Sequence, residues 1–209
     1  MKCVSLRNKN PNARRPQVAG AFAFACFGVC VAVVFCLCAR AGTVQSSPAP
    51  SQAEIRAAFV FNFVKFTEWP MQAYADAGSP LTTCFLGADD VRTAFQTIST
   101  GKALNGRFLE SKAVKSAADM HSCQVLYVDS PRSPVVIDVL KNARQHDALA
   151  IGTSEDFLAS GGMLRLQIEN NRMRFDVNVG AVGRTKIKLS SKLLALARNV
   201  VDLPEPAGN

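Results

Sequence analysis

The run "LTTCFLGADDVRTAFQTIS", residues 81–99, contains the unit that decides the fold. Its first seven residues are an apolar run that predicts a strand, and residues 88–99 carry apolar side chains at helical spacing. The same order returns in "QVLYVD" (124–129), a predicted strand, and "PVVIDVLKNARQ" (134–145), a predicted helix. Strands that alternate with helices of this length favour a largely parallel sheet covered on both faces.

Further elements extend this pattern in both directions. Residues 107–114 and 148–152 predict two more strands, and residues 52–69 predict a helix that ends before Pro70. Residues 189–200 predict a closing amphipathic helix, with Ser190 or Ser191 as its cap.

A hairpin is predicted between the strand at 148–152 and the closing helix at 189–200. Residues 161–179 contain two strand-like runs joined by Asn170 and Asn171, which are typical of a tight turn. We therefore expect an α/β fold with a three-layer, mostly parallel sheet flanked by helices on both faces, a C-terminal β-hairpin strand and a terminal helix.

Residues 1–41 are typical of an export signal rather than of a folded segment. A basic leader precedes the apolar run "AFAFACFGVCVAVVFCLCA", and Ala39 and Ala41 form a cleavage box. The alternative is an uncleaved membrane anchor, because the apolar run is long enough to span a bilayer. We expect a Pro-rich linker over residues 42–51, a single domain over 52–203 and a tail over 204–209.

Removing this leader changes what the composition implies. The chain has 24 Lys and Arg against 16 Asp and Glu, but six of the basic residues and none of the acidic ones lie in the leader. The exported part carries a net charge of only +2, which does not indicate a nucleic-acid-binding protein. Five of the seven cysteines also leave, and the remaining pair, Cys84 and Cys123, suggests one disulfide in an oxidising compartment. The alternative is two buried free thiols.

The stretch "AAFVFNFVKFTEWP", residues 57–70, holds four phenylalanines and the only tryptophan. On a helical wheel one arc, with Phe59 and Phe63, has the spacing of a core stripe. Phe61 and Val64 fall on a second arc beside Lys65 and Glu68, which predicts a docking or dimer surface. The alternative is a helix sandwiched inside the domain. Trp69 either pins the helix end to the sheet or is an exposed anchor.

Acidic residues follow two of the predicted strands, where open α/β sheets place a ligand crevice. Asp89 and Asp90 come after the first strand and Asp129 after the third. Helix capping explains them most simply; a small-molecule crevice or a Mg²⁺ site of the phosphoreceiver kind are the alternatives. Because His121 and His146 lack metal-ligand spacing and no catalytic motif is present, we expect neither an enzyme nor a cofactor.

The second strand of the predicted hairpin alternates polar and apolar residues. Arg172, Arg174, Asp176 and Asn178 therefore share one face. This face is either solvated or a partner contact, for which the exposed hairpin edge is the favoured form.

Taken in order, "AEIRAAFVFNFVKFTEWP", "TCFLG", "CQVLYVD", "SGGMLRLQIENNRMRFDVN" and "KLSSKLLALAR" resemble the YfiR-like family over residues 52–200. The resemblance implies a non-enzymatic periplasmic protein, often a homodimer, that binds the periplasmic sensor part of an inner-membrane diguanylate cyclase and holds it inactive. It implies effects on cyclic-di-GMP signalling and biofilm formation, and release by a peptidoglycan-binding lipoprotein of the outer membrane. The family's disulfide corresponds to Cys84 and Cys123; a second one found in some members has no counterpart here.

Overall fold

The computed structural model describes residues 49–206, so the predicted signal peptide and most of the predicted linker lie outside the described residues. Within 49–206, no helix has both the length and the apolar character needed to cross a membrane. The fold rests on an eight-stranded sheet with the strand order β10-β8-β7-β6-β5-β2-β4-β3. The strands are β2 (Leu81–Leu86), β3 (Ala103–Leu104), β4 (Arg107–Ala113), β5 (Cys123–Val128), β6 (Leu149–Gly152), β7 (Leu164–Glu169), β8 (Arg172–Asn178) and β10 (Asn199–Val201).

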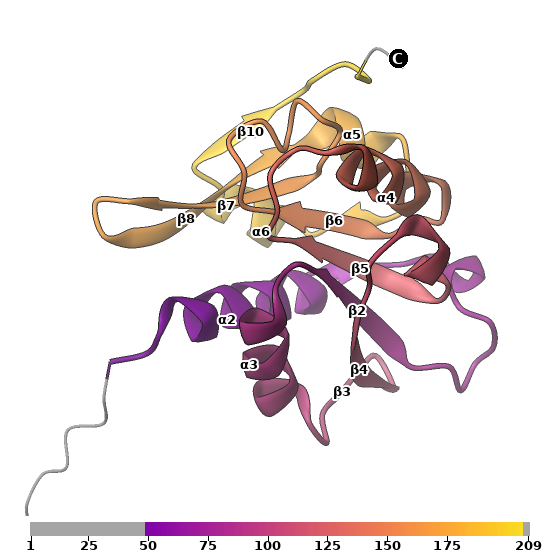
Figure 1. Ribbon diagram of the computed structural model, residues 1–209. Coiled ribbons are helices and arrows are strands. Elements are labelled where there is room, and N and C mark those ends of the chain that lie inside the picture. The colour runs from indigo at the N-terminus through magenta and orange to yellow at the C-terminus, as the bar shows by residue number, and fades with distance from the viewer. Residues whose placement is uncertain (1–48, 207–209) are drawn as a thin grey trace, which may run out of the picture. The chain divides into compact units, whose positions relative to one another are not determined.

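Most neighbouring strands in this sheet are parallel. Only β7 with β8 and β3 with β4 pair antiparallel. Helices α2 (Gln52–Lys65) and α3 (Asp89–Ser99) cover one face, and α4 (Pro134–Gln145) covers the other (Figure 1). The short elements are η1 (Met71–Ala73), η2 (Ala117–Met120), α5 (Val179–Gly183) and α6 (Ser191–Leu196). The three-layer α/β fold predicted from the sequence is therefore confirmed.

The central strands are apolar on both faces because helices cover both faces. Every residue of β2, β5 and β6 is buried, as expected for parallel strands of this kind. Local signals set the helix starts: Ser51 and Glu54 form a capping box for α2, and Ser133 caps α4 with a proline at its first position.

Two predicted helices are shorter in the structure because residues at their ends form strands that pair with distant segments. The first helix stops at Lys65 rather than Trp69, since Thr67–Glu68 (β1) pairs antiparallel with Lys188–Leu189 (β9). The last helix ends at Leu196, because β10 pairs with β8. Ser190 is its cap, with its hydroxyl accepting a hydrogen bond from the Leu193 N–H.

The core includes the first aromatic arc of α2 and the disulfide. The ring of Phe63 lies 5.0 Å from that of Phe175 on β8, which joins helix to sheet. Phe85 on β2 and Phe95 on α3 pack with ring centroids 5.5 Å apart, which joins α3 to the sheet. Cys84 and Cys123 form a disulfide between the adjacent strands β2 and β5, with Cα atoms 5.9 Å apart.

Candidate partner-binding surface

The second arc of α2 is turned toward α3 rather than toward solvent. Val64 is only 1% exposed, so its assignment to a docking surface is wrong. Phe61 is half-buried; its ring lies 6.5 Å from the ring of Phe95 on α3, and the ammonium of Lys102 lies 4.9 Å above it. Intramolecular packing therefore accounts for both aromatic arcs of this helix.

The end of the aromatic stretch is fastened to the sheet. The indole N–H of Trp69 donates a 2.9 Å hydrogen bond to the backbone oxygen of Gln124, which places the tryptophan as a pin. Lys65 and Glu68 are exposed, and Glu68 stands opposite Lys188 in the small β1–β9 pair. Among the described residues, these two charged side chains are the only members of the predicted helix surface that are exposed.

The predicted hairpin forms a projecting arm. We define the hairpin arm as residues 167–174, the ends of β7 and β8 with their turn, which extend beyond the rest of the domain in Figure 1. Arg172 and Arg174 lie on it, are exposed, and have no carboxylate within ion-pair distance among residues 49–206. They retain the accessibility that a partner contact requires.

Asp176 differs from these arginines because it is only 2% exposed, so its assignment as a surface residue is wrong. Its carboxylate lies 2.8 Å from the guanidinium of Arg165 and 3.1 Å from that of Arg198. The amides of Gln167 and Asn199 also donate to it. A carboxylate with four donors is satisfied, and it holds β7, β8 and the start of β10 together.

Sequence reasoning overlooked Arg165 and Arg198. The Asn170-Asn171 turn fixes the register that places Arg165 opposite Asp176, so this pair was accessible to a sequence argument. Arg198 reaches Asp176 from a separate part of the chain, and no local pattern predicts that contact.

The arm has one basic and one apolar face. On the basic face Glu169 is paired with Arg198. Asp176 lies on the same face of β8 but outside the arm, and it is paired with both Arg165 and Arg198. On the other face Ile168 is 48% exposed and stands opposite the half-buried Met173. A groove of about 540 Å³ lies outside the arm, and its lining includes Leu158, Arg165, Asp176, Arg198, Asn199 and Leu203.

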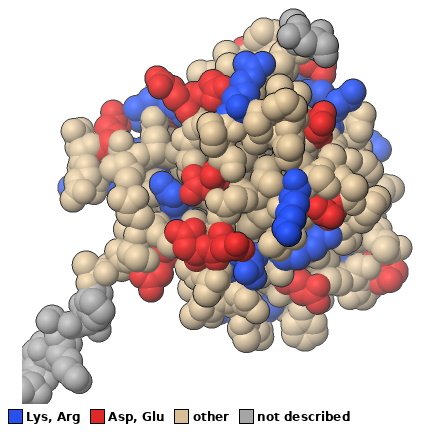
Figure 2. Space-filling view, viewed as in Figure 1, with Lys and Arg blue, Asp and Glu red and all other residues tan. Residues whose placement is uncertain are grey.

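The acids at the strand ends do not converge. Asp129 does not cap a helix: it pairs with Arg56 of α2 at 2.7 Å and accepts a hydrogen bond from Thr153. Asp89 pairs with Arg92 on α3. Figure 2 shows acidic atoms gathered over the N-terminal end of α3, with basic and acidic side chains otherwise interspersed on this face. Within residues 49–206 no three His, Cys, Asp or Glu side chains are grouped so as to hold a metal ion.

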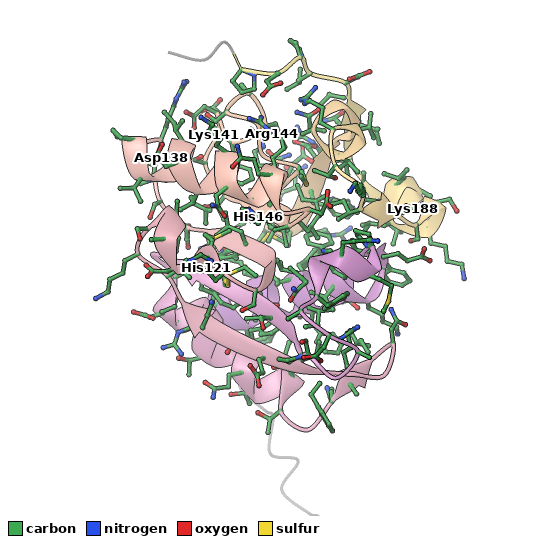
Figure 3. The ribbon with its side chains drawn as sticks, turned by 90° about the vertical axis from the view of Figure 1, so that its right-hand side faces the viewer. His121, Asp138, Lys141, Arg144, His146 and Lys188 are labelled. Atoms are coloured by element: carbon green, nitrogen blue, oxygen red, sulfur yellow. A yellow bond between two sulfur atoms is a disulfide. The ribbon has the colours of Figure 1, made fainter. Side chains whose placement is uncertain are left out.

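The two histidines lie on the face that α4 covers. His146 follows the end of α4, near Arg144, and His121 precedes β5 (Figure 3). The ring of His146 contacts the backbone oxygen of Asn142, one turn back on its own helix. This contact is local, as is usual at a helix end, and does not indicate a reaction centre.

Fold and arm together describe a disulfide-linked α/β domain with a projecting basic hairpin. Residues 53–198 match the profile of the YfiR/HmsC-like family, which is well over half of the chain. The chain belongs to this family, and membership implies a periplasmic regulator of diguanylate cyclase signalling.

Comparison with solved structures gave more distant similarities. A conserved domain protein from Vibrio cholerae O1 biovar El Tor is 12% identical, with a TM-score of 0.44 over 72% of this chain and 60% of that one. An ABC domain in complex with L-Trp from Streptococcus pneumoniae is 11% identical, with a TM-score of 0.38 over 63% and 58%. The chain therefore spans about three fifths of either protein. Comparison with curated proteins gave no match.

Proposed function

We propose that this protein represses an inner-membrane diguanylate cyclase by binding the periplasmic sensor part of that enzyme through the hairpin arm. The observation that carries the proposal is the pair Arg172 and Arg174, exposed on a projecting strand and without an intramolecular carboxylate. Membership of a family of cyclase regulators supports the choice of partner.

The remaining parts of the proposal follow the same family relationship. The protein is exported by a cleavable signal peptide, acts in the periplasm as a homodimer, and is released from the cyclase by a peptidoglycan-binding lipoprotein of the outer membrane. Repression lowers cyclic-di-GMP and with it biofilm formation. Neither a cofactor nor a nucleic acid takes part.

The alternative, a small-molecule-binding module at the carboxyl ends of the strands, has less support. The carboxylate of Asp129, which was the best polar group for such a crevice, is taken by Arg56 and Thr153. A bound solute would have to displace a part-buried ion pair, which costs free energy that a preformed pocket does not require.

Co-purification from membranes of the source bacterium tests the proposal. The tagged protein is used as bait beside an Arg172→Glu/Arg174→Glu variant and a control, Lys141→Glu/Lys192→Glu, which makes the same charge change at two exposed positions outside the arm. We expect a protein with a diguanylate cyclase domain to be recovered with wild type and control, and to be lost with the arm variant. Equal recovery with all three baits would contradict binding through the arm.

A further inference from the structure

The free edge of β8 on the hairpin arm carries an inference that rests on the proposed function and goes further. β10 pairs only with residues 176–178 of β8. The hydrogen bond from the Arg198 N–H to the Phe175 carbonyl shows that Phe175 directs its backbone oxygen away from β7. Because backbone direction alternates along a strand, Met173 directs both its N–H and its C=O to the same outer side.

No described strand covers this part of the edge, so Met173 offers an unpaired donor and acceptor to an incoming strand. The residues on either side of it, Arg172 and Arg174, direct their side chains to the basic face. An added strand would therefore meet two guanidinium groups on one face and the apolar pair Ile168 and Met173 on the other.

A second copy of the chain is a poor occupant of this edge. Antiparallel pairing of two β8 edges about Met173 places Arg172 of each copy directly opposite Arg174 of the other. Like charges directly opposite on neighbouring strands are destabilising. Exposed arginines at a sheet edge also oppose edge-to-edge self-association in general. Pairing of the arm with the arm of a second copy is therefore disfavoured.

We infer that the arm binds a partner segment by strand addition, and that this segment carries an acidic residue on each side of an apolar one. The two carboxylates lie opposite Arg172 and Arg174, where bidentate pairing with guanidinium groups is favoured. The apolar residue between them lies opposite Met173, beside Ile168. The pattern acidic-apolar-acidic is symmetric, so it holds for a parallel or an antiparallel segment.

Peptide binding tests the inference with the whole exported protein. The probes are synthetic peptides with the core Glu-Val-Glu or Lys-Val-Lys, and a Glu-Val-Glu peptide N-methylated at the valine and at the glutamate after it. These two amides are the donors that reach the Met173 carbonyl in an antiparallel and in a parallel segment, respectively, and their methylation keeps both charges. We expect the first peptide alone to bind wild type and to slow hydrogen exchange at the Met173 amide. The Arg172→Glu/Arg174→Glu variant is expected to lose at least tenfold in affinity for it and to prefer the lysine peptide.

Two results would overturn strand addition. The first is equal binding of the N-methylated peptide, since that indicates electrostatic attraction alone. The second is an unprotected Met173 amide at saturating peptide. The two levels of the proposal also separate: cyclase recovery that depends on the arm, without peptide protection at Met173, rejects strand addition and retains the proposed function. Peptide binding with no recovered cyclase rejects the proposed function and retains strand addition.

Discussion

The guanidinium of Arg56 lies 2.7 Å from the carboxylate of Asp129, which joins the first helix to the carboxyl end of the central strand β5. Both side chains are about three quarters buried, and Thr153 completes the site from β6's end. The pair therefore occupies the place where a doubly wound sheet ordinarily presents a ligand crevice.

Breaking this pair is expected to destabilise the fold. Asp129→Ala leaves a part-buried guanidinium without its carboxylate, which costs about 1–3 kcal/mol of unfolding free energy. A double-mutant cycle with Arg56→Ala measures the coupling by urea unfolding. The control pair is Asp89 with Arg92, whose carboxylate is exposed, and which should couple by less than about 0.5 kcal/mol. Equal coupling in the two pairs would show that burial has no part in the effect.

We expect the protein to lose stability at alkaline pH because of Tyr127, which lies next to this pair. Burial raises the pKa of Tyr127 far above its ordinary value, the charge of Asp129 raises it further, and the charge of Arg56 lowers it. The unfolded chain loses this proton near pH 10 while the folded protein keeps it. Stability contributed by the neutral phenol is therefore complete below pH 10 and falls above it by about 1.4 kcal/mol per pH unit.

Tyr127→Phe should remove this part of the pH dependence. The hydroxyl makes no hydrogen bond of ordinary geometry within residues 49–206, so the variant should lose little stability at neutral pH. Unfolding free energies at several pH values above 9, for wild type and Tyr127→Phe, provide the comparison. Tyr74, whose pKa is also raised by burial, is kept in both proteins so that its contribution cancels. An unchanged alkaline slope in Tyr127→Phe would place the tyrosine outside the titration.

The sequence predicted the strands and the hairpin well because their signals are local. The apolar runs at 81–87 and 124–129 are buried strands in the structure, and Asn170-Asn171 forms the turn that was expected. The signals failed where a distant segment decides the outcome: Thr67–Glu68 looks helical until it is paired with Lys188–Leu189.

The candidate surface was predictable only in part for the same reason. A helical wheel shows that Phe61 and Val64 share an arc, but it cannot show that α3 covers it. Strand alternation placed Arg172, Arg174 and Asp176 on one face correctly. It did not indicate that Arg198, which follows the last helix, would contact and help to bury Asp176.

Gln124 is expected to stabilise the turn that follows the Trp-Pro sequence. It is the extra residue of a bulge between β2 and β5, since Thr82 pairs with Cys123 and Thr83 with Val125. Its side chain accepts from the Thr82 N–H at 2.8 Å and donates to the Ala73 carbonyl at 2.6 Å. This amide therefore supplies a hydrogen bond that the bulge removes from the ladder.

Gln124→Leu keeps the volume but leaves a buried N–H and C=O unpaired, which should cost about 1–3 kcal/mol. Gln96→Leu, the loss of an exposed amide on α3 whose side chain makes no hydrogen bond within residues 49–206, is the matched control and should cost less. Urea unfolding measures both variants, and similar losses would argue against the bulge as the cause.

The disulfide is expected to be structural rather than a redox switch. Cys84 is 0% and Cys123 4% exposed, and the bond closes a loop of 39 residues. Cys84→Ala/Cys123→Ala should lower the unfolding free energy by about 4 kcal/mol. Thiol labelling of the folded wild type in mild reductant should be slow, because a reductant reaches the sulfurs only when the sheet opens. Rapid labelling without loss of fold would instead indicate a labile, regulatory bond.

Asp176 and Arg174 share a face of β8, but their substitutions should affect different properties. Asp176→Ala should lower stability, and Arg174→Ala should weaken partner binding. Asp176→Ala leaves Arg165 and Arg198 without their common carboxylate at a site where the acid is buried, so a loss of about 3–5 kcal/mol is expected. Arg174→Ala removes an exposed side chain without an ionic partner and should change stability by less than about 0.5 kcal/mol.

Partner binding should show the reverse order. Cyclase recovery falls in Arg174→Ala at full stability, whereas any loss in Asp176→Ala follows from its lower folded fraction and is restored when a lower temperature restores the fold. Urea unfolding and membrane co-purification on the same preparations check both. A stable Asp176→Ala protein that fails to recover the cyclase would show that the buried carboxylate orients the arm for binding, beyond holding the strands together.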